Sequence, residues 1–159
     1  MEYISTRNKN LKYNFKDIFL RGLAPDGGLF IPKQIKKYNE DEIKKLSVLN
    51  YTDLATEIIF NFCSSSLEKN KLKNLIKKSY KTFSSEEVIK IKKFGDLHLI
   101  ELYHGPTLAF KDIAMQILGN MYDEFNISSD NKVNIIVATS GDTGSAAIAA
   151  LNDRKNINV

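Results

Sequence analysis

The segment "VNIIVATSGDTGSAAIAALNDRKNINV", residues 133–159, carries the pattern of a parallel α/β fold. Its first part, "VNIIVATS", is rich in Val and Ile, which is typical of strands buried in parallel sheets. "GDTGSAAIAALNDRK" starts with a glycine and continues as a helix of small residues, and "INV" predicts the start of another strand. The order strand, helix, strand predicts consecutive strands in one sheet.

The residues before this segment extend the pattern by one unit. "LHLIELY" (97–103) predicts a strand, "HGPT" (104–107) a turn, "AFKDIAMQILGNMYDEF" (109–125) a helix and "NISSDNK" (126–132) a loop. The whole predicts fold class α/β, a parallel sheet with crossover helices. Because the last strand only begins at the end of the chain, we expect a truncated part of a longer protein. The alternative, a complete small domain, would expose long apolar edges.

Residues 1–90 differ in being rich in Lys and Asn, with short helical patterns between turns. Pro25, Gly27 and Gly28 predict a turn before a short strand at 29–31. We predict a small N-terminal α+β domain over residues 1–90 and the beginning of an α/β domain over residues 91–159. Helices are predicted at "FKDIFLRGL" (15–23), "NEDEIKKLSVL" (39–49), "YTDLATEIIFNFC" (51–63, N-cap Thr52) and "SLEKNKLKNLIKKSYKTF" (66–83), with further cap signals in "SSEEVIKI" (84–91).

Charge and cysteine usage exclude several classes of protein. The net charge of +4 invites a nucleic-acid interpretation, but arginine occurs only at Arg7, Arg21 and Arg154, so the bidentate contacts that dominate nucleic-acid recognition are nearly absent. Cys63 is the only cysteine, which excludes an intrachain disulfide and a cysteine-rich metal site. The N-terminus lacks the apolar core of a secretory signal, and no stretch is long enough to span a membrane. We therefore expect a cytoplasmic protein that binds neither nucleic acid nor membrane.

The motif "HGPTLAFKD", residues 104–112, places a lysine where a charge is unfavourable. Its turn delivers Lys111 to the start of an apolar helix, at the end of a predicted strand where ligands of α/β sheets gather. Partial burial beside the positive end of a helix dipole favours the neutral amine, which is the nucleophile that forms a Schiff base. The alternative is a lysine that merely extends its charge to solvent, and the residues alone leave both open.

The motif "ATSGDTGSAA", residues 138–147, predicts a strand that turns into a helix through glycines. Glycines let the backbone approach a ligand closely, and the free N–H groups of a helix start favour an anion. Ser140 and Thr143 add hydroxyl donors. The spacing is neither that of a dinucleotide fingerprint nor that of a P-loop, so a carboxylate or a cofactor oxygen fits better than a nucleotide. The alternative is an ordinary N-capped turn.

Taken together, "ELYHGPTLAFKDIAMQILGN" (101–120) and "ATSGDTGSAA" resemble the threonine synthase family of pyridoxal-phosphate enzymes, which have the tryptophan-synthase-β-like fold (fold type II). "YISTRN" (3–8) and "GLAPDGGLFIP" (22–32) also resemble the N-terminal domain of that family. The resemblance covers nearly the whole chain. It implies that the α/β part is the start of the cofactor domain.

The resemblance also implies roles for individual residues. Lys111 would form the Schiff base with pyridoxal 5'-phosphate and shuttle protons at the substrate carbons. The loop from Thr139 to Thr143 would bind the amino-acid carboxylate and lie along the cofactor, and Phe110 could pack near the cofactor ring. Asp112 could instead cap or orient the helix. The implied cofactor-binding residues are Lys111, Ser140, Gly141, Asp142 and Thr143; the implied substrate-binding residues are Thr139, Ser140, Gly141, Thr143, His104 and Thr107; no metal is implied.

In many relatives of this fold an Asn from this loop meets the pyridoxal 3′-oxygen; here the matching residue is Asp142, as is usual in threonine synthases. An ionised carboxylate cannot donate a hydrogen bond to a phenolate and would repel it. Asp142 must therefore carry a proton or point elsewhere if the resemblance holds.

The implied reaction converts O-phospho-L-homoserine and water to L-threonine and phosphate. A related phospho-lyase that releases a keto acid, or a non-catalytic fragment serving as an interaction module, are the alternatives. The family's glycine-rich phosphate loop and the partner of its pyridine nitrogen cannot be identified in these 159 residues. We therefore expect the chain to be inactive by itself.

Overall fold

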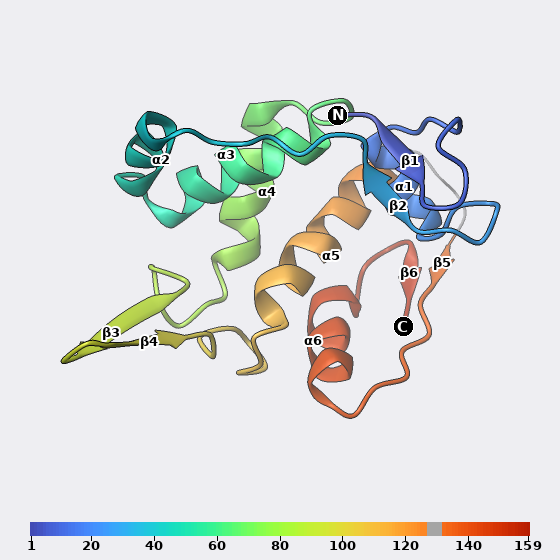
Figure 1. Cartoon of the computed structure of the whole chain (residues 1–159). Coiled ribbons are helices and arrows are strands. Elements are labelled where there is room, and N and C mark those ends of the chain that lie inside the picture. The colour runs from blue at the N-terminus through green and yellow to red at the C-terminus, as the bar shows by residue number, and fades with distance from the viewer. Residues whose placement is uncertain (127–131) are drawn as a thin grey trace. The chain divides into compact units, whose positions relative to one another are not determined.

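The computed structural model describes residues 1–126 and 132–159 (Figure 1). The chain forms two compact units, Met1–Asn74 and Leu75–Val159. The domain boundary predicted after residue 90 was placed where the composition changes, and it remains a prediction. Most of the predicted loop 126–132 lies outside the described residues.

The first unit combines a two-stranded antiparallel ladder with helices. Strand β1 (Tyr3–Ser5) pairs with β2 (Phe30–Pro32), so that Ile4 lies opposite Ile31. The predicted strand at 29–31 is thus confirmed with a shift of one residue, whereas β1 was not predicted. The helices confirm the apolar spacing read from the sequence: α1 (Phe15–Arg21), α2 (Glu40–Ser47), α3 (Tyr51–Cys63) and the beginning of α4 (Lys69–Tyr80).

Asparagine side chains cap the first three helices. Asn14, Asn39 and Asn50 each accept a hydrogen bond from the backbone N–H three residues later, at 3.0, 2.9 and 3.0 Å. The prediction of Thr52 as the cap of α3 was wrong, because Asn50 already fills that position and Thr52 lies inside the helix. Cys63 ends this helix fully buried, and burial raises the pKa of its thiol to about 11.

The second unit contains the end of α4 and two small ladders. Strands β3 (Lys90–Phe94) and β4 (Leu97–Glu101) form an antiparallel hairpin around Gly95, which has a φ of 58°. The prediction that residues 97–103 open the parallel sheet was therefore wrong. The segment 84–91, which carries the predicted cap signals, forms a turn that leads into β3 and does not start a helix. In this turn Val88 donates its N–H to the carbonyl of Ser85 at 3.1 Å.

The parallel pairing predicted for the last two strands is confirmed. Strand β5 (Val133–Asn134) pairs in parallel with β6 (Ile157–Asn158), and α6 (Asp142–Leu151) connects them. The ladder of β5 stops at Asn134, short of the predicted strand end. Helix α5 (Asp112–Asn126) supplies Met115 and Tyr122 to a core formed by Ala147, Ala150, Leu151 and Ile157.

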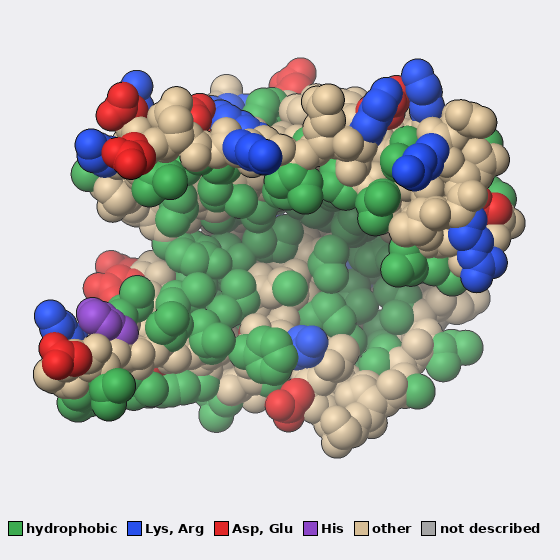
Figure 2. All heavy atoms as spheres, in the orientation of Figure 1, with side chains coloured by type: hydrophobic (Ala, Val, Ile, Leu, Met, Phe, Trp, Pro, Cys, Tyr) green, Lys and Arg blue, Asp and Glu red, His purple; other side chains and the backbone are tan. Residues whose placement is uncertain are grey.

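The hairpin carries exposed apolar side chains on both faces. The register places Ile91 opposite Ile100 on one face, and Phe94 opposite Leu97 on the other; all four are more than half exposed. Figure 2 shows green, apolar side chains at the surface of this part of the molecule. An isolated two-stranded hairpin is only marginally stable in water, so these faces are suited to packing.

In the part of the chain that the structure describes, no helix has the length and apolarity required to cross a bilayer.

Candidate functional site

Lys111 immediately precedes α5. Its carbonyl accepts the N–H of Met115 at 2.9 Å, the first helical turn, and its side chain is half-buried. The ammonium lies 4.7 Å from the centre of the Phe110 ring, a cation–π contact. Among the described residues no carboxylate forms an ion pair with it. The amine therefore contacts an aromatic ring and forms no salt bridge with the residues that the structure describes.

A buried carboxylate holds the turn that leads to Lys111. Asp112 is fully buried, and its two oxygens accept the backbone N–H and the hydroxyl of Thr107, both at 2.8 Å. A Cβ added to Gly105 would overlap the side chain of Asp112, so only glycine fits there. Asp112 thus connects this turn to the first residue of α5. Thr107 directs its hydroxyl to Asp112, and its role in substrate binding stays a prediction.

Leu108 lies in the same turn with strained backbone geometry. Its φ is 62°, a left-handed conformation that is rare for a bulky residue, and its side chain is 69% exposed. Its N–H bonds the carbonyl of Gly105 at 3.2 Å. Residues held in such conformations occur often at functional sites, where the surrounding structure enforces them.

Glu101, the last residue of β4, belongs to the same region and was not predicted. It is 3% exposed and lies 2.5 Å from the Lys92 ammonium and 3.0 Å from Nε2 of His104. The hydrogen bond from Lys92, helped by those from Tyr103 and His104, lowers the pKa of Glu101 to about 2. Glu101 also lies beside an apolar run, but a polar residue at the end of a strand carries no signal in the sequence that sets it apart.

The second loop opens α6 without a side-chain cap. Gly141 has a φ of 145°, a conformation open only to glycine, and a Cβ there would meet no atom within 4 Å. Thr139 accepts the Gly141 N–H at 3.0 Å through its hydroxyl. Within the described residues, the N-cap position Gly141 makes no side-chain hydrogen bond to the helix, so the loop lacks the side-chain cap of an ordinary N-capped turn. Ser140 and Asp142 are exposed and Thr143 is half-buried.

The two loops lie at the same end of the second unit, because α5 and α6 run parallel. Gly119 packs so closely on Ala150 that a Cβ there would overlap the Ala150 carbonyl oxygen, and one turn further along α5 the side chain of Asp123 pairs with Arg154. Both contacts move toward the C-terminus on both segments, so the two helices run in the same direction. The N-terminal ends of α5 and α6 therefore lie at the same end of the unit (Figure 1). Lys111 and the loop 139–143 therefore lie at the same end of the second unit.

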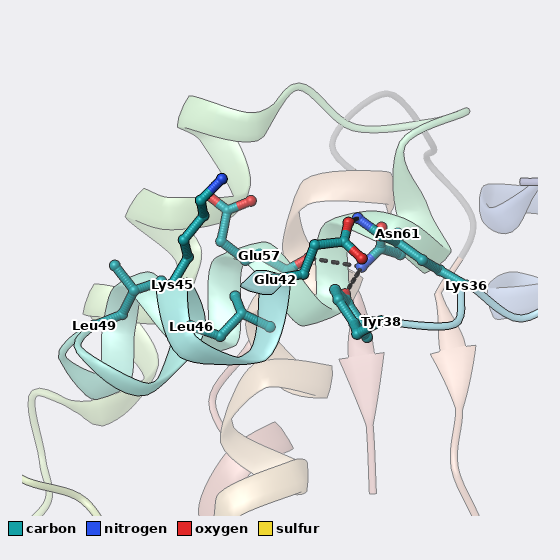
Figure 3. A pocket seen from close by; sticks show the side chains of 8 residues that line it. All are labelled: Lys36, Tyr38, Glu42, Lys45, Leu46, Leu49, Glu57 and Asn61. Carbon is teal, nitrogen blue, oxygen red and sulfur yellow. Dashed lines mark hydrogen bonds and ion pairs between the residues drawn. The ribbon is translucent and has the colours of Figure 1, made fainter. Parts of the chain in front are cut away.

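A cavity of about 310 Å³ elsewhere contains none of these residues. It lies within the first unit, between α2 and α3 (Figure 3), where Glu42 pairs with Lys36 at 3.0 Å and Asn61 donates to the Tyr38 hydroxyl. Among residues 1–126 and 132–159, no cluster of His, Cys, Asp and Glu could hold a metal ion.

Known proteins match the whole chain. A family model described as the threonine synthase N terminus matches residues 2–80. The threonine synthase of Pseudomonas aeruginosa is 38% identical over 160 residues, which cover 100% of this chain and 34% of that protein. The human protein named threonine synthase-like 2 is 35% identical over 161 residues, covering 100% of this chain and 33% of its own length.

The solved structures agree with these matches. The crystal structure of pyridoxal-phosphate-bound threonine synthase from Brucella melitensis has a TM-score of 0.90 and 35% identity, over 99% of this chain and 34% of that one. The similarity thus extends to the fold as well as the sequence. The chain spans about a third of the length of the curated relatives it matches.

Proposed function

Because the chain belongs to the threonine synthase family, we propose that it supplies the lysine-bearing part of an enzyme that converts O-phospho-L-homoserine and water to L-threonine and phosphate. One observation carries the proposal. The parallel packing of α5 and α6 brings Lys111, an amine without an ion-pair partner among the described residues, to the same end as an uncapped helix start. An amine nucleophile beside an anion site is what an amino-acid substrate and an aldehyde cofactor require.

The cofactor in this proposal is pyridoxal 5'-phosphate, and the residues present fit it. The Lys111 amine is available for a Schiff base, and the open space in front of Gly141 lets a flat group approach the backbone. Lys111, Ser140, Gly141, Asp142 and Thr143 would hold it. When bound, the cofactor supplies an electron sink for the carbanions of the reaction.

The chain's own residues would position and protonate the substrate. The N–H groups that open α6 and the hydroxyls of Ser140 and Thr143 would bind the substrate carboxylate, while the Lys111 amine moves protons at its α and β carbons. His104 and Thr107 would line the pocket, with Thr107 acting from its fixed place on Asp112. Asp142 is exposed at the first position of α6, where an ionised carboxylate can turn away from the cofactor oxygen.

A second candidate is a phospho-lyase that eliminates phosphate to yield a keto acid. The chain matches proteins named threonine synthase and threonine synthase-like 2 over its whole length, so we keep this second candidate beside the first. Assays for threonine and for 2-oxobutyrate with the same enzyme distinguish the two. A cytoplasmic location is part of both proposals, and the single, buried thiol supports it.

The test is replacement of Lys111 by Ala in a full-length enzyme, in which this chain is followed by the remaining part of the Pseudomonas aeruginosa relative. We expect loss of the visible absorption band of the bound cofactor and at least a ~10³-fold fall in kcat, because the nucleophile is gone. The matched control is Lys93→Ala, an exposed lysine on β3. Unchanged absorption and turnover in Lys111→Ala would support a non-catalytic interaction module instead.

A further inference from the structure

Glu101, the last residue of β4, binds hydrogen-bond donors from β3 and from the turn that follows β4. Its Oε1 lies 2.5 Å from the Lys92 ammonium on β3, and its Oε2 lies 3.0 Å from Nε2 of His104. The nearby Tyr103 hydroxyl further lowers the pKa of this carboxyl. A buried carboxylate held by two donors has both oxygens occupied, so it can act as a fixed reference for the groups around it.

The chemistry of this carboxylate decides the tautomer of His104. The donors keep Glu101 ionised at neutral pH, and an ionised carboxylate can only accept hydrogen bonds. Nε2 of His104 must therefore carry the proton, which makes Nδ1 the acceptor nitrogen of the neutral ring. Within residues 1–126 and 132–159, Nδ1 has no hydrogen-bond partner, and it is not buried.

The ring of His104 is also held by its neighbours. The Tyr103 ring centre lies 4.8 Å from it, and the His104 carbonyl accepts the N–H of Ser84 at 2.9 Å. The next residue, Gly105, packs against Asp112, which directly follows Lys111. This contact brings the backbone that carries His104 and the backbone that carries Lys111 into the same region of the unit.

We propose that Glu101 is a positioning residue of the active site, which fixes His104 with its proton on Nε2 and presents Nδ1 as a proton acceptor to the substrate. The proposal rests on the proposed function, because it needs a substrate beside Lys111. An ammonium or a water molecule bound there could donate to Nδ1, whereas a fully ionised phosphate could not. Glu101 acts through His104 and touches no substrate itself.

The first test reads the tautomer directly and needs no activity. The chain has two histidines, and His98 is exposed on the hairpin, so each long-range ¹H–¹⁵N spectrum of the imidazoles contains its own reference. At about pH 9, where a free imidazole is neutral, we expect His104 to be only the Nε2–H tautomer and His98 to be a mixture. A His104 pattern equal to that of His98, or an Nδ1–H tautomer, overturns the proposal.

Two substitutions distinguish a positioning role of Glu101 from a purely structural role. Glu101→Gln offers an amide that can accept from or donate to the ring, so His104 should become a mixture of tautomers. Lys92→Gln weakens the same cluster but leaves the carboxylate on His104, so the tautomer should stay fixed. Equal scrambling in both variants, with circular dichroism showing both folded, would mean that Glu101 has only a structural role and would overturn the proposal.

The second test is turnover in the full-length enzyme. We expect Glu101→Gln to lower kcat about 10- to 100-fold with little change in KM, because a misplaced proton acceptor hinders proton transfer more than binding. Wild-type kcat in a variant whose tautomer is scrambled would overturn the positioning role while leaving the proposed function intact. An inactive wild-type enzyme with a fixed tautomer would instead refute the proposed function.

Discussion

At the scale of single residues, Asp112 stabilises the turn that precedes Lys111 through its two hydrogen bonds to Thr107. We predict that Asp112→Ala lowers the free energy of unfolding by about 2 kcal/mol, because the Thr107 N–H loses its partner in a partly buried place and the fully buried carboxylate is removed. Asp112→Asn should lower it by less than about 1 kcal/mol, since the amide oxygen keeps that N–H and the amide nitrogen can donate to the Thr107 hydroxyl. Urea unfolding of both variants measures the difference, and equal losses would contradict this account.

Glu101 predicts a pH dependence of stability. Its pKa is about 2 in the folded chain and near 4.5 when unfolded, so its contribution is complete above about pH 4.5 and is lost as the pH falls toward about 2. Lys92 remains charged throughout this range and Tyr103 remains neutral, so the loss follows the carboxylate. Urea midpoints of the wild type should fall more steeply over this window than those of Glu101→Gln. Identical slopes would contradict the prediction.

The sequence revealed some of these residues and concealed others. Lys111 stood out because its charge lies among Leu108, Phe110 and Ile113. Glu101 did not, since a polar residue at the end of an apolar run is also what an ordinary strand terminus looks like. Only the ladder, which brings Lys92 toward Glu101 across the hairpin, shows that the carboxylate is buried and paired. Side-chain pairing between strands is not encoded in local spacing.

At the scale of elements, α5 and α6 depend on one glycine for their close packing. Gly→Ala inside a helix usually stabilises by roughly 0.5–1 kcal/mol. At Gly119 we predict the opposite sign, a loss of about 1–3 kcal/mol, because the new methyl group would meet the Ala150 carbonyl and the Arg154 guanidinium. The control is Ala114→Gly, an exposed position on the same helix, which should lose only the ordinary helix propensity. Thermal unfolding of both variants compares the two, and a stabilised Gly119→Ala would refute the close packing.

Helices with periodic apolar residues could be predicted from the sequence, whereas the pairing partners of the strands could not. The 3.6-residue spacing in "YTDLATEIIFNFC" gave α3 its observed bounds, since an amphipathic helix is encoded locally. "LHLIELY" fits a buried parallel strand and a hairpin strand equally well, so the antiparallel partner of β4 could not be read from it. The loop with Lys111 and the loop 139–143 were found separately, but their common location follows only from the helix packing.

At the scale of the whole molecule, we predict that the 159-residue chain has no threonine synthase activity by itself. It spans about a third of its relatives, and neither a glycine-rich phosphate loop nor a partner for the pyridine nitrogen can be identified in it. Incubation with pyridoxal phosphate and O-phosphohomoserine should therefore release no phosphate above the Lys111→Ala background. Steady release from the wild-type chain alone would refute this prediction, and the full-length enzyme serves as the positive control.

The left-handed backbone of Leu108 has a consequence for how such a protein can be improved. The side chain is 69% exposed, so Leu108→Asn would lose little burial, and Asn tolerates this conformation far better. A screen for heat resistance would therefore favour replacement at position 108. Because Asn favours the left-handed conformation that the turn already has, the turn before Lys111 would keep its shape and turnover would be retained. Selection for heat resistance and selection for turnover should therefore both accept Asn at position 108.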